Sequence, residues 1–225
     1  MLTEYVTELL EAPDVQLIIN RVQAVLNDEK KRRQSFYEWL TDDVKAEFIN
    51  GEVIMHSPVK RRHLRASGNL STLLRIYVQF HGLGEVDIEK AMVSLTRNDY
   101  EPDICFWRKE VADTFDDDTM QHPAPDLVVE ILSKGTAKRD RATSVGGIKF
   151  EDYAAHGVRE YWLVDPTRQT VEQFQLDEAF MAFDAVGNFH LNDSITALTV
   201  TGFTIPVRAI FEQEANSEAL KSLLS

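Results

Sequence analysis

The sequence contains a single cysteine, Cys105, and no long hydrophobic segment. One cysteine excludes an intramolecular disulfide framework and an all-cysteine zinc site. The apolar run around it, Ile104–Trp107, predicts a small core residue rather than a nucleophile. No apolar run approaches the roughly 18 residues of a membrane-spanning helix, and the acidic first residues are unlike a targeting segment. We therefore expect a cytoplasmic protein.

Positive charge is also scarce, with 24 lysine and arginine residues against 37 acidic residues and a formal net charge of −13. A uniformly acidic surface repels the phosphates of nucleic acids. The distribution is uneven, because no carboxylate lies between Glu52 and Glu85, and residues 134–149 hold only Asp140. The basic residues of these two segments are Lys60, Arg61, Arg62, Arg65, Arg75, Lys134, Lys138, Arg139, Arg141 and Lys149. They form either a basic surface that contacts phosphates or ordinary solvated helix faces.

Length and composition suit one folded domain with an extension, since 44% of the 225 residues are hydrophobic. Apolar residues at helical spacing predict helix over residues 4–33, interrupted near Pro13 and Asp14 and followed by a solvated joint at 28–33. The expected boundaries are an N-terminal helical extension at 1–34, a main domain at 35–212 and a C-terminal helical tail at 213–225.

The main domain is predicted to have an α/β fold with a mixed sheet. Two short strands flank Asn50 and Gly51, which suit a two-residue hairpin turn. The other expected elements are a helix at 60–80, strands at 86–96, 102–107 and 125–132, a helix at 136–155, a strand at 161–164, antiparallel strands within 169–207 and a helix at 212–224. Strand, helix and strand over 125–164 predict a βαβ crossover with parallel pairing. Turns are expected at Gly187-Asn188 and at Gly202.

Two acidic residues occupy apolar strands. Glu130 lies in the middle of the run Pro125–Leu132, and Asp103 stands at the head of the strand that contains Cys105. A buried carboxylate is costly unless it is paired, protonated or bound to a metal. Carboxylates from neighbouring strands can converge on Mg²⁺, which polarises a phosphodiester and lowers the pKa of bound water. The sequence therefore predicts that Asp103 and Glu130 bind a metal ion, although Asp103 alone also suits a turn at the strand start.

Six segments, taken in order, resemble the PD-(D/E)XK nuclease superfamily and, more narrowly, the Uma2 family of restriction endonucleases. They are Ala46–Ile54, Ser57-Pro58, His63, Pro102-Asp103, Val128–Ser133 and the stretch from Lys149 through Tyr153 to Pro166. The similarity spans about residues 35–212. It implies a restriction-endonuclease-like core with flanking helices, in which Asp103 and Glu130 bind Mg²⁺ or Mn²⁺. It also implies that Glu47 is an auxiliary acid and that the Ile131 carbonyl completes the metal shell.

The chain departs from the superfamily pattern at its lysine, because the usual position, two residues after the second acid, is Leu132. The resemblance places the substitute at Lys149 on the following helix, with Lys134 and Lys138 as alternatives. The residues expected to contact nucleic acid are Lys60, Arg61, Arg62, His63 and Lys138. His63 is equally compatible with a packing role.

These observations together predict a metal-dependent DNA endonuclease with Glu47, Asp103, Glu130 and Lys149 in its catalytic site. A homodimer is compatible with this activity, since two copies can cut both strands. The alternative is a DNA-binding or dimeric scaffold protein on the same fold that has lost turnover. In a third interpretation Glu130 is purely structural, which requires a partner for its carboxylate.

Overall fold

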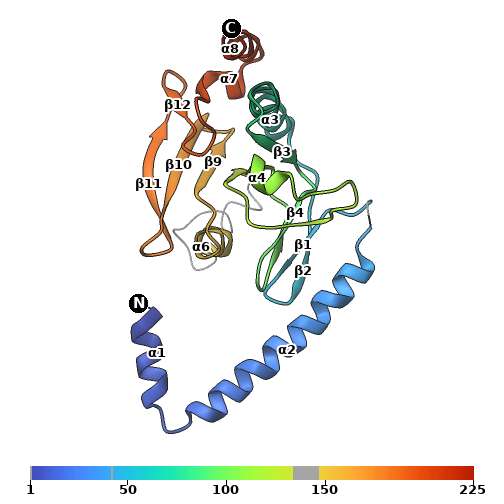
Figure 1. Cartoon of the computed structure of the whole chain (residues 1–225), viewed down its shortest axis with the longest axis vertical. Helices are drawn as coiled ribbons and strands as arrows, with labels where there is room; N and C mark the ends of the chain where they lie inside the picture. The colour runs from blue at the N-terminus through green and yellow to red at the C-terminus, as the bar shows by residue number, and fades with distance from the viewer. Residues whose placement is uncertain (1, 42, 134–146) are drawn as a thin grey trace. The chain divides into compact units, whose positions relative to one another are not determined.

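The computed structural model describes residues 2–41, 43–133 and 147–225, which fall into two compact units, Met1–His56 and Ser57–Ser225 (Figure 1). The first unit contains two helices, α1 (Leu2–Glu11) and α2 (Val15–Trp39), and two strands, β1 (Ala46–Ile49) and β2 (Glu52–Met55). None of the described helices is both long and apolar enough to cross a membrane.

The predicted hairpin in the first unit is confirmed. β1 and β2 pair antiparallel with Ile49 opposite Glu52, and the turn between them is Asn50-Gly51. Both turn residues have positive φ, 50° for Asn50 and 83° for Gly51, which is the backbone that a tight hairpin turn requires.

The helix predicted over residues 4–33 is confirmed in part. The helix breaks between Glu11 and Val15, as Pro13 and Asp14 predict. The prediction of a solvated joint at 28–33 is wrong, because α2 continues through these residues to Trp39. Lysine and arginine favour helix, and the end of α2 packs on the hairpin through Phe36, whose ring centroid lies 5.7 Å from that of Phe48. The charged run is therefore part of the helix and does not break it.

The second unit is built on a six-stranded sheet with the order β11-β10-β9-β8-β6-β3. These strands are β3 (Gly84–Ile88), β6 (Ile104–Arg108), β8 (Leu127–Ile131), β9 (Glu160–Asp165), β10 (Thr170–Asp177) and β11 (Ala182–Phe189). β8 and β9 pair in parallel, and the crossover between them carries α6 (Ile148–Ala155). The other neighbours in this sheet pair antiparallel. The predicted mixed sheet and βαβ crossover are therefore confirmed.

One face of this sheet holds the main hydrophobic core. Ile104, Phe106 and Val129 point into it, together with leucines of α3 (Arg61–His81) that recur at helical spacing. α3 ends at Gly82, whose φ of 63° is the left-handed backbone of a helix C-terminus. The helices α7 (Arg208–Phe211) and α8 (Gln213–Leu223) and the hairpin of β12 (Ser194–Thr196) with β13 (Thr204–Pro206) add to the same core.

Shorter elements complete the second unit. They are β4 (Met92–Ser94), β5 (Asp99–Tyr100), α4 (Lys109–Ala112) and β7 (Gln121–His122). β4 pairs antiparallel with β5 and parallel with β7. The single strand predicted at 86–96 is thus two strands, β3 and β4, in different sheets, and the chain turns between them at Glu89, which has a φ of 63°.

The turn predicted at Gly187-Asn188 is wrong, because both residues lie within β11. Gly187 stands opposite Gln173 beside a register shift, and the β-bulge there absorbs the glycine. The actual turn joins β10 to β11, where Asp177 Oδ1 accepts hydrogen bonds from the backbone N–H groups of Ala179 and Phe180. The turn at Gly202, whose φ is 81°, is confirmed.

Candidate active site

Asp103 and Glu130 lie side by side on one face of the six-stranded sheet. In the antiparallel pair of β6 and β8, Cys105 faces Val128 and Ile104 faces Val129, so the next position brings Asp103 opposite Glu130. Directly opposed residues project from the same face. Asp103 Oδ2 also accepts a hydrogen bond of 2.7 Å from the Ile131 N–H, which fixes the carboxylate beside β8. Asp103 is 8% exposed and Glu130 4% exposed.

Lys149 reaches the same face from α6. Its Nζ donates a 2.8 Å hydrogen bond to Glu130 Oε1, and the lysine is 2% exposed. Tyr153, one turn further along α6, places its hydroxyl 3.5 Å from the same oxygen. The Lys149 ammonium also lies 5.6 Å from the centre of the Tyr100 ring. The described chain thus brings two acids and one lysine together, as the sequence predicted, while Lys134 and Lys138 lie outside the described residues.

A polar network that the sequence did not reveal holds α6 in place. The Asp152 carboxylate accepts hydrogen bonds of 2.7 Å from Asn98 Nδ2 and from the Tyr100 hydroxyl. At the end of α6, His156 Nε2 lies 2.8 Å from the Thr96 hydroxyl oxygen. Both contacts join α6 to the β4–β5 segment, and neither follows a recognisable spacing in the sequence. The position of Lys149 therefore depends on this network.

His63, in the first turn of α3, points inward to Asp103. Its Nε2 lies 3.1 Å from Asp103 Oδ1, and the side chain is 7% exposed. Its Nδ1 makes no hydrogen bond to any described residue. The histidine is therefore in contact with the acid pair, whereas its role in phosphate binding stays a prediction.

The three basic residues just before His63 are exposed at the start of α3: Lys60, Arg61 and Arg62. Arg62 Nη1 donates a 3.1 Å hydrogen bond to Thr167 Oγ1, close to the end of β9. The first turn of α3 contains no acidic residue, so the positive end of the helix dipole adds to these charges. Lys138, the fifth residue predicted to contact nucleic acid, lies outside the described residues.

Glu47 belongs to the first unit. It is completely buried in β1, and its Oε2 lies 3.5 Å from His56 Nε2. Its role as an auxiliary acid stays a prediction.

Cys105 is a buried core residue, as its apolar neighbours predict. Burial raises the pKa of its thiol, and the negative charges of Glu130, Asp87 and Asp103 raise this pKa further, while Lys149 lowers it. Asp87 stands opposite Cys105 in the pair of β3 and β6, so it is a third carboxylate on this face. Sequence reasoning missed Asp87 because its strand carries no long apolar run that would make a carboxylate conspicuous.

The donor set suits a hard cation held partly by water. Asp103 and Glu130 supply carboxylate oxygens from adjacent strands, and Mg²⁺ is usually bound through one or two carboxylates plus waters and substrate phosphate. Within the described ranges no group of three or more His, Cys, Asp or Glu side chains is arranged to hold a metal by itself. The residues present therefore fit a Mg²⁺ ion that shares its coordination with solvent and substrate.

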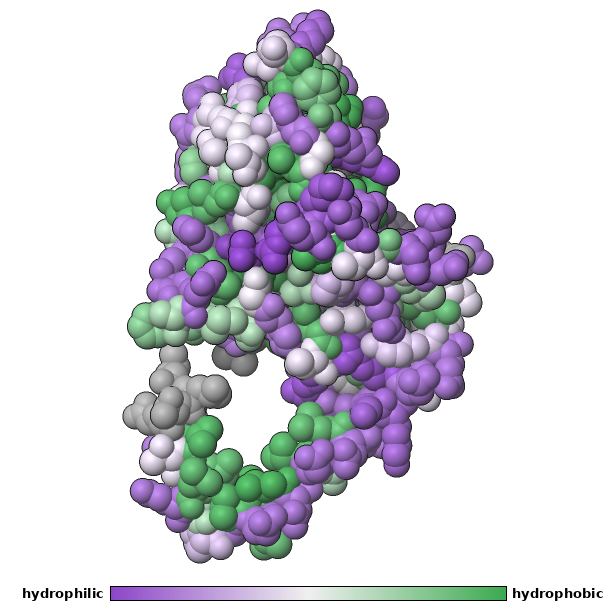
Figure 2. Space-filling view, in the orientation of Figure 1, coloured by the Kyte–Doolittle hydropathy of each residue, from purple (hydrophilic) through white to green (hydrophobic). Residues whose placement is uncertain are grey.

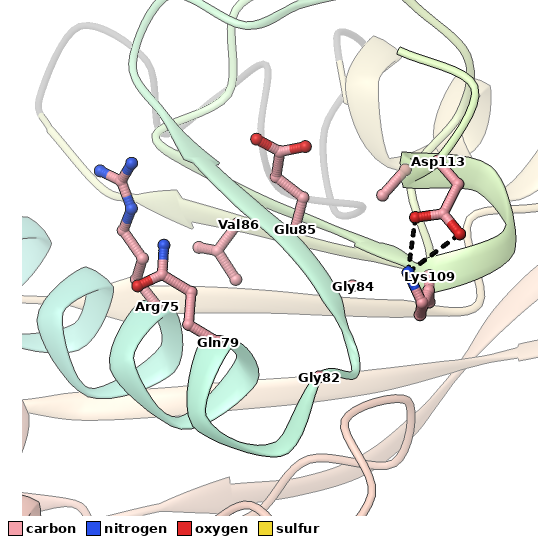
Figure 3. Close-up of a pocket in the computed structure, with 9 residues that line it drawn as sticks. Arg75, Gln79, Gly82, Gly84, Glu85, Val86, Lys109 and Asp113 are labelled. Carbon is pink, nitrogen blue, oxygen red and sulfur yellow. Dashed lines mark hydrogen bonds and ion pairs between the residues drawn. The ribbon is translucent and has the colours of Figure 1, made fainter. Parts of the chain in front are cut away.

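A surface pocket of about 320 Å³ lies away from these acids (Figure 3). It opens between α3 and α4, where Lys109 Nζ donates a 2.7 Å hydrogen bond to Asp113. Gly84 lines it and pairs with Arg108, at the end of β6 opposite to Asp103. None of the predicted site residues lines this pocket.

Comparison with known proteins decides the family. Residues 33–208 match the Uma2 family model, which is described as "Putative restriction endonuclease". The chain belongs to the Uma2 family. A crystal structure from Anabaena variabilis ATCC 29413, described as "a putative nuclease belonging to DUF820", is similar with a TM-score of 0.63 and 16% sequence identity. The similarity covers 78% of this chain and 94% of that chain. No curated protein matches.

The Uma2 match confirms both the predicted family and the mixed α/β fold of the restriction-endonuclease-like type. It begins at residue 33, within α2, so α1 and more than half of α2 lie outside it. Asp103, Glu130 and Lys149 all lie inside it.

Proposed function

We propose that this Uma2 protein is a Mg²⁺-dependent endonuclease that hydrolyses phosphodiester bonds of DNA. The observation that carries the proposal is the cluster of Asp103, Glu130 and Lys149, three buried charged side chains that meet on one sheet face. They come from the residue before β6, from β8 and from α6. Charged groups of this kind are costly to bury, and they gather where a site uses them.

Asp103 and Glu130 hold the cation in this proposal. A bound Mg²⁺ supplies Lewis-acid polarisation of the phosphodiester and lowers the pKa of its water. The Ile131 N–H and the His63 Nε2 each contact one oxygen of Asp103, so they keep that carboxylate in a single orientation. The Ile131 carbonyl is the further ligand that the family resemblance implies, and Glu47 is the auxiliary acid.

Lys149 provides positive charge for the phosphate. An ammonium in a buried site stabilises charge that develops in a transition state far more strongly than it would in water. Lys149 stands beside Glu130 because Asp152 holds α6 against the β4–β5 segment. In this proposal Lys149 takes the part of the strand lysine, whose usual position is occupied by Leu132. The migrated lysine keeps the three-charge set of the superfamily pattern.

The exposed cations at the start of α3 attract the DNA backbone. Lys60, Arg61 and Arg62 precede His63, which contacts Asp103, so the basic turn begins next to the acid pair. Contacts to phosphates carry no sequence information by themselves, and they make binding sensitive to salt. Lys138 belongs to the same proposed surface.

The test is cleavage of supercoiled plasmid with Mg²⁺ or Mn²⁺ by the full chain and by Asp103→Asn, Glu130→Gln and Lys149→Met. Matched controls are Asp113→Asn and Lys109→Met, which remove the same charges from an exposed ion pair between the first residue of α4 and the residue that follows the helix. We expect the wild type and both controls to nick the plasmid and the three site variants to lose at least 100-fold in rate.

Two outcomes contradict the proposal. Equal cleavage by all six proteins would indicate a contaminating nuclease. DNA binding by every protein with no cleavage by any would support the alternative, a binding protein or scaffold on the same fold. A folded state that survives each substitution, checked by circular dichroism, keeps the comparison valid.

A further inference from the structure

One side of α2 is covered over only half of its length. With 3.6 residues per turn, this side carries Val15, Ile18, Ile19, Val22, Val25, Leu26, Glu29 and Phe36. Glu29 and Phe36 are buried, and Phe36 packs on Phe48 of the hairpin. Toward the N-terminus the same side is open, since Val22 is 52% exposed and Leu26 38% exposed. The apolar side of α2 therefore extends beyond the hairpin that it covers.

α1 adds to this surface. Val6 and Leu10 are also exposed, and Figure 2 shows hydrophobic atoms gathered along both helices. We call the exposed set the arm face: Val6, Leu10, Ile19, Val22, Val25 and Leu26. Its exposed apolar area is on the order of 500 Å², as large as the largest patch on a typical monomer, and such patches mark interaction sites.

The arm face lies outside the residues that match the Uma2 family model. The family match starts at residue 33, and the similarity to the Anabaena structure covers 94% of that chain but 78% of this one. An extension with its own exposed apolar side points to an added interaction.

The charges along the arm indicate which partner the arm face binds and in which direction. The N-terminal end of the arm is acidic, with Glu8, Glu11 and Asp14, whereas residues 30–33 of α2 are all lysine or arginine and follow Asp28 and the buried Glu29. Two parallel copies would place like charges together. Two antiparallel copies would place the acidic end of each beside the basic end of the other, with the apolar residues in between.

We propose that the arm face binds a second copy of this chain, with two α2 helices antiparallel about a two-fold axis between Val22 and Gln23. In this register Ile19 lies opposite Leu26 of the partner subunit, and Asp14 lies level with the basic run at residues 30–33 of the partner subunit. In a two-fold interface both copies use the same patch, so the patch has to be complementary to itself, as this charge pattern is. With its polar rim, a patch of this size approaches the roughly 800 Å² per partner of a standard interface. This proposal stands independently of the proposed nuclease activity.

The first test is the mass of the full chain in solution, measured by light scattering at micromolar concentration. We expect the wild type at twice the 25.7 kDa of one chain. Val22→Asp brings two like charges together next to the axis and should weaken association roughly 100-fold or more. The matched control is Leu17→Asp, an exposed residue on the opposite side of the same helix, which should remain dimeric.

The second test fixes the direction of the helices. Two single-cysteine variants, Ile19→Cys and Leu26→Cys, are mixed and oxidised; Cys105 is buried and does not interfere. An antiparallel pair gives the mixed disulfide, because only cysteines with Cα atoms within roughly 7 Å can be bridged. Disulfides joining two Ile19→Cys chains would show a parallel pair instead and would overturn the register. A wild-type chain that stays monomeric, or one that binds lipid vesicles through Val22 rather than itself, would overturn the proposal.

Discussion

The buried pair of Lys149 and Glu130 makes the sharpest prediction about stability. The two groups are 2.8 Å apart, and their side chains are 2% and 6% exposed. Removal of one partner from a buried ion pair leaves an uncompensated charge and costs about 3–5 kcal/mol. Lys149→Met should therefore lower the free energy of unfolding by this amount. For a chain of this length the melting temperature should fall by roughly 6–20 °C.

The double substitution separates this effect from simple loss of packing. Glu130→Leu together with Lys149→Met replaces both charges by apolar groups, so its cost should be far below the sum of the single costs. The coupling energy should be on the order of 3 kcal/mol. The matched exposed pair, Lys109 with Asp113, is 59% exposed on each side and should show a coupling of at most about 1 kcal/mol.

The assay is urea unfolding followed by tryptophan fluorescence, since Trp107 and Trp162 are fully buried in the second unit. Additive effects at Lys149 and Glu130, or single costs below about 1 kcal/mol, would refute the claim that the pair is buried and directly bonded.

Three further predictions follow from the site. Saturating Mg²⁺ or Mn²⁺ should raise the melting temperature of the wild type and leave that of Asp103→Asn unchanged. At an ion concentration 100 times the dissociation constant, the wild type should gain about 2.7 kcal/mol of stability. An equal rise in both melting temperatures would place the ion elsewhere. Replacing the cations at the start of α3, Lys60, Arg61 and Arg62, by glutamine should reduce the slope of log binding constant against log salt concentration by about one unit per lost phosphate contact. Lys221→Gln on α8 should leave this slope unchanged. Filter binding to DNA at several salt concentrations measures the slope. The raised pKa of Cys105 keeps the folded thiol protonated at pH values where the unfolded thiol has lost its proton, so the free energy of unfolding should fall as pH rises above roughly 8.5; thiol labelling that proceeds without unfolding at pH 8 would contradict this.

The acid pair could be predicted because strands have a short period. Residues two apart share a face, so acids at the ends of two neighbouring apolar strands meet once those strands pair. The same logic could not assign the lysine, because Lys149 reaches Glu130 from a helix whose docking depends on contacts with Asn98 and Tyr100. Tertiary contacts of this kind leave no period in the sequence.

Glu160 shows why a carboxylate in an apolar strand is an ambiguous signal. It starts β9, is completely buried, and resembles Glu130 in its sequence setting. Its oxygens accept five hydrogen bonds, from Trp162 Nε1, Gln173 Nε2, the Leu198 N–H, and the N–H and hydroxyl of Thr199. Glu160 is therefore satisfied by neutral donors from the surrounding fold, a structural role that the sequence did not reveal.

The contrast between these two glutamates bears on the third interpretation, in which Glu130 is structural. That interpretation requires a partner for the carboxylate, and Lys149 is such a partner. A purely structural pair, however, gains nothing from a second acid, yet Asp103 lies directly opposite Glu130 and is itself held by His63 and the Ile131 N–H. Neutral donors would satisfy a structural glutamate at lower cost, as they do at Glu160. The grouping of charges, rather than the burial of any one of them, is what favours a site that handles phosphate and metal.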